Sequence, residues 1–249
     1  MVKSFMCKQS SLAAVMTLHE GSASNTSSLF MLVLYLLILC FFLAFLYIRK
    51  SKTYKSAKIV KKLCIGKSQE QAKIIAYFLR VGCGAKTISD EAYINMVDNE
   101  KNKYGSSEYA LNKLGLDGGQ VKEVKPICFQ GFAYEDAYVK KTVSGKWVSS
   151  RYEITWIFFS DSQVHVYSCR FDMDKDNKRE TTSEYFYRDV NSFSTISEME
   201  KGQNDITVPT EKFGMYGAGI NFECALTDDN AAQTINGMRQ KLREKKEQL

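Results

Sequence analysis

Residues 151–171, RYEITWIFFSDSQVHVYSCRF, decide the architecture of this chain. In the first part, Tyr152, Ile154, Trp156 and Phe158 alternate with Arg151, Glu153 and Thr155, so the apolar side chains share one strand face. Residues 160–162, Ser-Asp-Ser, have the composition of a turn, and residues 164–171 are rich in β-forming side chains. The stretch therefore predicts an antiparallel hairpin with one apolar and one polar face.

The period-2 pattern continues on both sides of this hairpin. Further candidate strands are residues 124–129, 133–140, 181–190, 192–197, 206–213 and 220–226. We expect about seven antiparallel strands after the break at Gly118-Gly119. Residues 172–178 form a polar turn between two of them.

One amphipathic helix closes the chain. Thr227 is a candidate cap, and Ile235, Met238 and Leu242 fall on one stripe. Residues 239–246 carry five bases and one acid, which complements the negative end of the helix dipole. The predicted fold class is α+β, with a partly open barrel whose open end the terminal helix fills.

Before Gly118 the period is helical. A helix is predicted over residues 69–80, a second starts at Ser89, and a third covers residues 107–114 and ends at Gly115. Ile59 and Leu63 continue a further helix out of the preceding apolar run.

That apolar run, residues 29–48, LFMLVLYLLILCFFLAFLYI, contains no charge, Pro or Gly. A helix of about 20 residues spans a bilayer's hydrocarbon core, which predicts a transmembrane helix. The chain then divides into a flexible extracytoplasmic leader (1–28), the transmembrane helix (29–48), a basic helical segment (49–116) and a β domain (117–249). We expect residues 117–249 to fold alone.

The basic residues that follow the span set the orientation. The positive-inside rule places this flank in the cytoplasm and the N-terminus outside, in a plasma (inner) membrane. The same side chains are candidate contacts for anionic lipid. They are Arg49, Lys50, Lys52, Lys55, Lys58, Lys61 and Lys62.

The strand order, the segments ITWIFFSDSQVHVYS and EYFYRDVNSFST, and the ending MRQKLREKK resemble bacterial pleckstrin-homology-like (PH-like) domains. More closely, residues 111–246 resemble single-pass bacterial membrane proteins that carry such a domain. The resemblance implies the fold and binding of lipid headgroups, peptides or proteins. It brings no catalytic residues.

Three motifs resemble ligand-binding or catalytic sites, but each lacks a residue or partner that such a site needs. Gly66-Lys67-Ser68 lacks the earlier Gly and the preceding strand of a phosphate-binding loop. Residues 172–177 resemble the opening of a calcium loop, but Asn177 stands where that loop needs Gly. His165 has no spaced partner for a triad and reads as a strand residue. We expect no cofactor, no metal and no nucleic-acid binding.

The sequence favours a membrane-anchored, non-enzymatic cytoplasmic module that binds or scaffolds protein or lipid, with the bilayer and a protein as partners. One alternative is an accessory structural subunit that acts through its transmembrane helix. The other is an enzyme with an unrecognised site, which a deep pocket with converging polar groups would favour.

Overall fold

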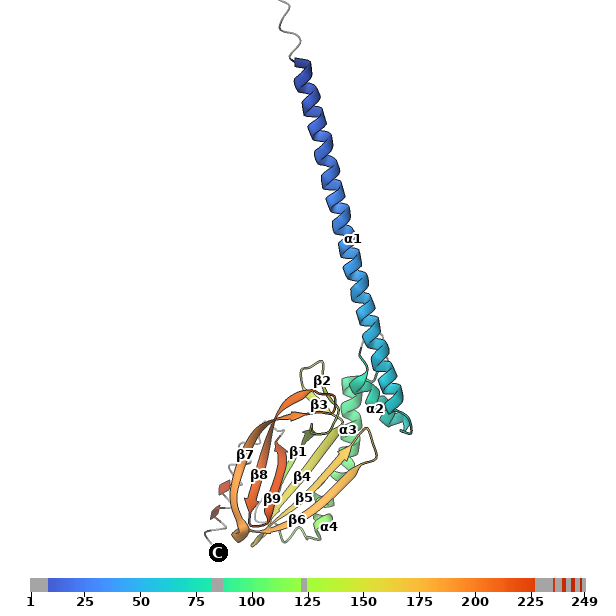
Figure 1. Cartoon of the computed structure of the whole chain (residues 1–249). Helices are drawn as coiled ribbons and strands as arrows, with labels where there is room; N and C mark the ends of the chain where they lie inside the picture. Colours follow the sequence, from blue (N-terminus) through green and yellow to red (C-terminus); the bar gives the residue numbers. More distant parts are fainter. Residues whose placement is uncertain are drawn as a thin grey trace, which may run out of the picture. The chain divides into compact units, whose positions relative to one another are not determined.

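The computed structural model describes residues 9–81, 87–121 and 125–226, together with Ile235, Arg239, Gln240, Arg243, Glu244 and Glu247. The chain forms two compact units, Met1–Lys55 and Ser56–Leu249. The first unit contains most of one long helix, and the second contains the sheets and the remaining helices (Figure 1).

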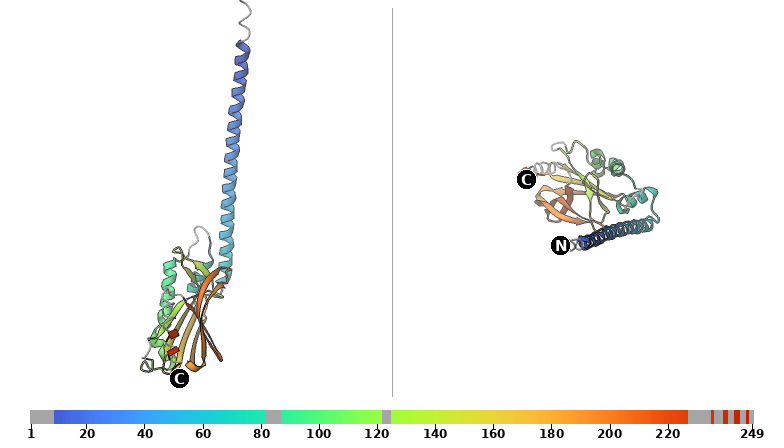
Figure 2. Two further views of the ribbon diagram at one scale, coloured as in Figure 1. Left: turned by 90° about the vertical axis from the view of Figure 1, so that its left-hand side faces the viewer. Right: turned by 90° about the horizontal axis from the view of Figure 1, so that it is seen from above.

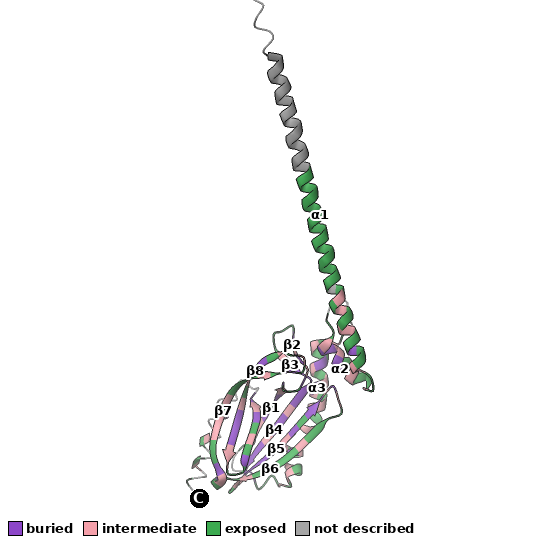
Figure 3. Cartoon of the chain, viewed as in Figure 1, coloured by how far each residue is buried: buried purple, intermediate pink, exposed green. Residues whose placement is uncertain are grey.

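The long helix α1 (Gln9–Leu63) contains the apolar run, which is confirmed as continuous helix. Every residue from 29 to 48 is exposed (Figure 3). Leu29–Leu63 is the one helix in the described part of the chain that is long and apolar enough to span a membrane, and it is compatible with a membrane anchor. The helix begins at Gln9, so the predicted flexible leader is wrong from that residue on. The helix of the apolar run extends back to Gln9, because no Pro interrupts residues 9–28 and adding residues to an existing helix is easier than starting a new one.

Three short helices follow, and each is capped by the serine that precedes it. The side chains of Ser68, Ser89 and Ser106 accept a hydrogen bond from a backbone N–H of the first turn. Gly115 ends the last helix in the left-handed conformation, with φ of 68°. These helices confirm the three predicted ones: α2 (Gln69–Leu79), α3 (Asp90–Tyr104) and α4 (Ser107–Leu114).

In the described part of the chain, nine strands form three antiparallel sheets, where about seven strands were expected. The four-stranded sheet has the order β1-β4-β5-β6, the three-stranded sheet β7-β8-β9, and β2 pairs with β3 alone. The strands are β1 (Ile127–Ala133), β2 (Val139–Lys141), β3 (Trp147–Ser149), β4 (Arg151–Phe159), β5 (Gln163–Asp172), β6 (Lys178–Phe186), β7 (Val190–Lys201), β8 (Thr207–Gly217) and β9 (Ile220–Leu226).

The predicted hairpin of residues 151–171 is confirmed as β4 and β5. Trp156 lies opposite Tyr167, and Phe159 lies opposite Val164 at the turn. The two larger sheets do not close into one hydrogen-bonded barrel, because β1 and β9 lie near each other with no ladder between them among the described strands.

The four-stranded sheet is covered on both faces (Figure 2). On one face, Ile154 and Phe158 pack with Tyr77 and Tyr93 of the helices. On the other face, Ile157 packs with residues of β7–β9. The prediction of one polar face is therefore wrong, since Arg151 and Thr155 on that face are buried too. The sheet of β7–β9 covers this face. The alternation of residues within one strand does not reveal whether a second sheet packs against it.

The helices and the sheet share one core. Ile74, Tyr93 and Ala110 belong to the same apolar cluster as Tyr152 of β4 and Phe171 of β5. The expected boundary at residue 117 therefore runs through this core.

The turn between β7 and β8 is hydrogen-bonded to β2 and to the loop before it. The side-chain amide of Asn204 accepts a hydrogen bond from the N–H of Val139 (3.0 Å) and donates one to its carbonyl oxygen (2.7 Å). The N–H of Gln203 donates to the carbonyl oxygen of Ala137 (2.8 Å). An amide side chain thus pairs with β2 as a strand residue would.

The predicted terminal helix is described only in part. Ile235 is helical and 3% exposed, as expected of the predicted apolar stripe, and it lies in the core between the two larger sheets. Arg239, Gln240, Arg243, Glu244 and Glu247 are helical too. Thr227, Met238 and Leu242 lie outside the described residues.

Candidate functional site

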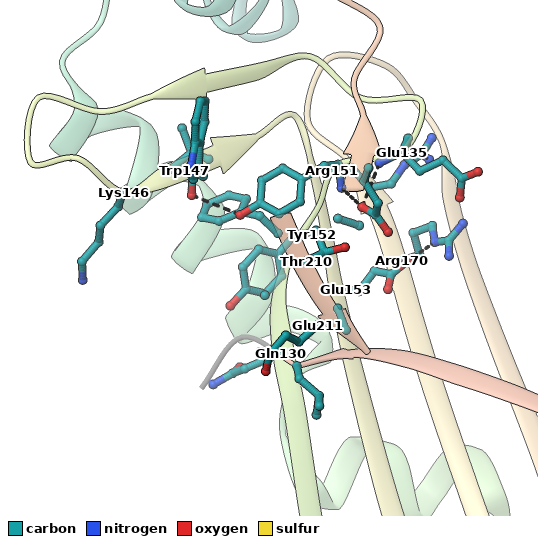
Figure 4. Close-up of a pocket in the computed structure, with 18 of the residues that line it drawn as sticks. Gln130, Glu135, Lys146, Trp147, Arg151, Tyr152, Glu153, Arg170, Thr210 and Glu211 are labelled. Atoms are coloured by element: carbon teal, nitrogen blue, oxygen red, sulfur yellow. Dashed lines mark hydrogen bonds and ion pairs between the residues drawn. The ribbon is translucent and has the colours of Figure 1, made fainter. Parts of the chain in front are cut away.

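A large cavity of about 1080 Å³ lies around the edge of β1. Four successive residues of β1, from Gln130 to Ala133, line it. Phe132 belongs to the helix-side cluster, whereas Gly131 and Ala133 follow the opposite alternation. The cavity therefore reaches both faces of the strand at its edge (Figure 4).

A buried ion pair braces one wall of the cavity. Nε of Arg151 in β4 lies 2.6 Å from Oδ1 of Asp172 in β5, and Nη1 donates to the carbonyl oxygen of Glu135 at 2.7 Å. Asn177 donates to the other carboxylate oxygen of Asp172. Burial would raise the pKa of Asp172, but the bonds from Arg151 and Asn177 outweigh burial and lower this pKa. Both charges are fixed in place.

Three further ion pairs fix charges on the strands of this wall. Glu153 of β4 pairs with Arg170 of β5 across the strands. Lys212 of β8 contacts Glu198 (2.5 Å) and Glu200 (2.7 Å). Burial would lower the pKa of Lys212, but its two carboxylate partners raise this pKa on balance.

Glu200 also joins β7 to the loop after β1. Its Oε2 accepts hydrogen bonds from the backbone N–H groups of Tyr134 (3.1 Å) and Glu135 (3.3 Å). Its other carboxylate oxygen binds Lys212, so the whole carboxylate is engaged.

Aromatic side chains form the upper part of the lining. The hydroxyl of Tyr134 donates to the carbonyl oxygen of Trp147 at 3.4 Å. Burial raises the pKa of both Tyr134 and Tyr152 to about 12. Both phenols are therefore neutral at physiological pH.

Three carboxylates of the lining are exposed and engage no hydrogen bond or ion pair among the described residues: Glu91 of α3, Glu135 of the β1–β2 loop and Glu211 of β8. In total the cavity is lined by seven carboxylates and four basic side chains, so its potential favours a cation. The acidic lining residues are Asp90, Glu91, Glu135, Glu153, Glu200, Glu211 and Glu223, and the basic ones are Lys146, Arg151, Arg170 and Lys212.

The predicted lipid-contact residues lie elsewhere. Lys50, Lys52, Lys55, Lys58, Lys61 and Lys62 are all exposed on α1, and the side chain of Arg49 lies outside the described residues. Val60 is the buried residue of this part of the helix, at 5% exposed. Ile59, which was expected to continue the apolar face, is 54% exposed.

The weak motifs have structural roles. Ser68 of the Gly-Lys-Ser run caps α2 and exchanges two hydrogen bonds with Gln71. Asp172, the first residue of the calcium-like run, is paired with Arg151. Among the described residues, no group of three or more His, Cys, Asp or Glu side chains could hold a metal ion.

His165 has neighbours that sequence spacing did not reveal. Its Nε2 lies 3.1 Å from the hydroxyl of Ser160, and its Nδ1 lies 3.6 Å from Glu184, which faces it across the β5–β6 pair. The hydroxyl of Ser160 donates to the carbonyl oxygen of Gln163 in its own turn. The His–Glu distance is longer than a hydrogen bond. We assign the trio to the stability of the hairpin end.

A smaller cavity of about 400 Å³ has the opposite charge. It lies at the start of β7, where Tyr187, Val190 and Phe193 meet Arg239 and Arg243. Nη2 of Arg239 donates to the hydroxyl of Thr195 at 3.2 Å.

Neither cavity could be read from the sequence. The lining of the large cavity runs from Asp90 to Leu226, and Glu91, Glu135 and Glu211 come from three separate elements. Isolated acids at exposed positions of a helix, a loop and a strand carry no signal before these elements are assembled. No protein-family model, no curated protein and no solved structure matches this chain.

Proposed function

We propose that this protein is a membrane-anchored, non-enzymatic module whose body binds another protein. The observation that carries the proposal is the cavity around β1. Its wall charges are fixed by ion pairs, while three exposed carboxylates engage no partner among the described residues. A preformed cavity with a few exposed polar groups is typical of a binding site.

The large cavity is also the feature that would favour the enzyme alternative. Its titratable groups favour binding over catalysis. Arg151, Asp172 and Glu200 are held in ion pairs, and the pKa values of Tyr134 and Tyr152 lie far above neutrality. General acid–base catalysis needs a group with a pKa near the operating pH.

The sheet topology supports a PH-like fold for the body. Four antiparallel strands and then three follow one another in meander order, with β2 and β3 as an inserted hairpin. Ile235 of the terminal segment lies in the core between the two sheets. We propose that this segment fills the open end of the barrel, as the resemblance implies.

The basic end of α1 supports the membrane placement. We propose an inner-membrane anchor with the N-terminus outside and the body in the cytoplasm, because basic residues follow the apolar run. Each exposed lysine near an anionic membrane surface contributes about 1 kcal/mol. The lysines of α1 therefore serve lipid contact, and the acidic cavity, which repels anionic headgroups, serves the protein partner.

Site-specific photo-crosslinking in native membranes tests this proposal. A photoreactive residue replaces Asn95 of α3, which is exposed and lines the cavity, or Asn112 of α4, which is exposed and does not. We expect a discrete crosslinked protein from position 95 and none from position 112. The crosslink should persist when residues 29–48 are replaced by another apolar span.

The span replacement separates the proposal from its alternative. Loss of the crosslink on replacement alone would favour an accessory subunit that acts through its transmembrane helix. Equal crosslinks from positions 95 and 112 would contradict binding at the cavity.

A further inference from the structure

We infer that the body of this protein forms a two-fold symmetric dimer, in which strand β6 of one copy pairs antiparallel with strand β6 of a second copy. The inference goes beyond the proposed function, because β6 and β1 are opposite edges of the four-stranded sheet. Three observations carry it: an unpaired strand edge, an edge sequence that is complementary to itself in one register, and a symmetry that suits two chains with anchors in one membrane.

Strand β6 is an exposed outer strand. It pairs with β5 along its whole length and with no other strand in the described part of the chain. None of its residues is buried, and it contains neither Pro nor Gly. A long, regular edge of this kind is a template for the addition of another strand.

The bonds at the two ends of the β5–β6 ladder show which main-chain groups point outwards. The N–H of Asp172 donates to the carbonyl oxygen of Asn177 (2.9 Å), and the N–H of Tyr187 donates to that of Ser162 (3.2 Å). In an antiparallel ladder, such bonded pairs alternate with unbonded pairs. The odd-numbered residues of β6 therefore bond to β5, and its even-numbered residues direct their N–H and C=O groups outwards. Among the described residues, no hydrogen bond engages these outward groups.

Side-chain charge selects one register for the pair of β6 strands. Like charges directly opposite each other destabilise a sheet, and opposite charges stabilise it. When Lys178 of one copy lies opposite Glu184 of the other, two such pairs form, and Thr181 lies opposite Thr181 on the two-fold axis. The same register places Glu180 opposite Thr182. A shift by two residues in either direction would instead place Glu180 opposite Glu184 or opposite a second Glu180.

Both charges of the Lys178–Glu184 pair are accessible at the edge. The side chain of Lys178 is 40% exposed and that of Glu184 is 53% exposed. The neighbour of Glu184 in its own chain is Nδ1 of His165, 3.6 Å away, and burial keeps the pKa of His165 below 6.5. At physiological pH the carboxylate of Glu184 therefore has no cationic partner among the residues that the structure describes.

The symmetry of this pairing suits two copies in one membrane. The two-fold axis of an antiparallel strand pair is perpendicular to the sheet, so the same face of both sheets points to the same side. Helix α2 covers one face, and the N–H of Val81, which follows α2, donates to the hydroxyl of Ser56 in α1 at 3.3 Å. Both copies therefore connect to their apolar helices from the same side of the joined sheet.

Disulfide crosslinking of the full chain in native membranes tests the inference. Thr181 is exposed and would face its counterpart as an unbonded pair, in which the two Cα atoms lie about 4.5 Å apart, within the range of a disulfide. We expect Thr181→Cys to give a linked dimer on mild oxidation, beyond any that the unchanged chain gives. The control, Ser197→Cys, places a thiol at an exposed position of β7, an outer strand of the other sheet, and should add no dimer.

Two further changes are made in the chain that carries Thr181→Cys. Thr182→Pro removes an outward N–H that β5 does not use and should lower the dimer yield by about tenfold, whereas Thr182→Val keeps this N–H and should leave the yield unchanged. Lys178→Glu should lower the yield by about threefold, because it faces Glu184 of the other copy. Adding Glu184→Lys should restore the dimer, since opposite charges again face each other.

Contrary results overturn the inference. Equal yields from Thr181→Cys and Ser197→Cys would mean random collision, and a full yield with Thr182→Pro would exclude strand pairing. If proline unfolds the body, the charge exchange decides, because it alters no main-chain group, and its failure to restore the dimer would contradict the register and the pairing. A disulfide to another protein in place of the dimer would show that a different chain occupies this edge.

Discussion

At the scale of single residues, the buried pair of Arg151 and Asp172 holds together the start of β4, the end of β5 and the loop after β1. The guanidinium bonds both the Asp172 carboxylate and the carbonyl oxygen of Glu135. The two side chains are 10% and 1% exposed. Without the guanidinium, the buried Asp172 carboxylate would keep only Asn177 and the partly exposed Lys175, whose Nζ lies 3.4 Å from it.

Removing one charge of this pair should destabilise the body strongly. We expect Arg151→Ala to lower the free energy of unfolding by about 3–5 kcal/mol, because the buried Asp172 loses its guanidinium partner and keeps only Asn177 and the more exposed Lys175. Unfolding by urea in mild detergent, followed by the fluorescence of Trp147 and Trp156, measures the change. The variant Arg170→Ala, whose side chain is 49% exposed, is the control and should lose about 1 kcal/mol or less. Equal losses in the two variants would contradict the bracing role of Arg151.

His165 should make stability depend on pH. Burial lowers its pKa below 6.5, and the attraction of Glu184 opposes burial only in part. The unfolded chain then binds a proton more readily than the folded chain. The folded state should be fully stabilised above pH 6.5 and lose stability as the pH falls from 6.5 through the lower folded pKa.

The variant His165→Gln checks this expectation. Thermal melts of both proteins across this pH range should show that the fall in stability attributed to His165 disappears in the variant. An unchanged pH profile would mean that His165 keeps its ordinary pKa in the fold.

At the scale of the elements, the sequence predicted single helices and strands, and it missed the contacts between elements that lie far apart in the chain. Serine caps and Gly115 marked the helices α2–α4, and alternation marked β4 and β5. Strand β3, with three residues, is too short for a period to register. Burial of Thr155 and the cavity around β1 depend on β7–β9, which lie far along the chain.

The shared core changes the expectation for a shortened chain. Residues 117–249 alone would expose the sheet face that Ile74, Tyr77 and Tyr93 cover. Loss of one buried aromatic side chain already costs about 3–5 kcal/mol, against a total stability of about 5–15 kcal/mol. We therefore expect residues 117–249 to give no cooperative melt.

Residues 56–249 are the matched control, because they form one compact unit with the helices included. This fragment should melt cooperatively and show dispersed amide signals. A cooperative melt of residues 117–249 would restore the boundary expected from the sequence.

At the scale of the whole molecule, the proposed topology puts the cavity and the lysines of α1 on the cytoplasmic side. A reporter that is active only in the cytoplasm should be active when fused after Leu249, because the basic residues follow the apolar run. The same reporter fused before Met1 should be inactive. Activity of a periplasmic reporter after Leu249 would overturn the orientation.

The bond between Asn204 and Val139 has a consequence for amide hydrogen exchange. The N–H of Val139 donates to a side chain that lies 65 positions further along the chain. Its exchange with solvent deuterium therefore requires the β7–β8 turn to lift from β2, while the pairing of β2 with β3 can stay intact. The exchange rate of this single amide reports how often that end of the body opens, and Asn204→Ala should make it exchange as fast as an exposed amide.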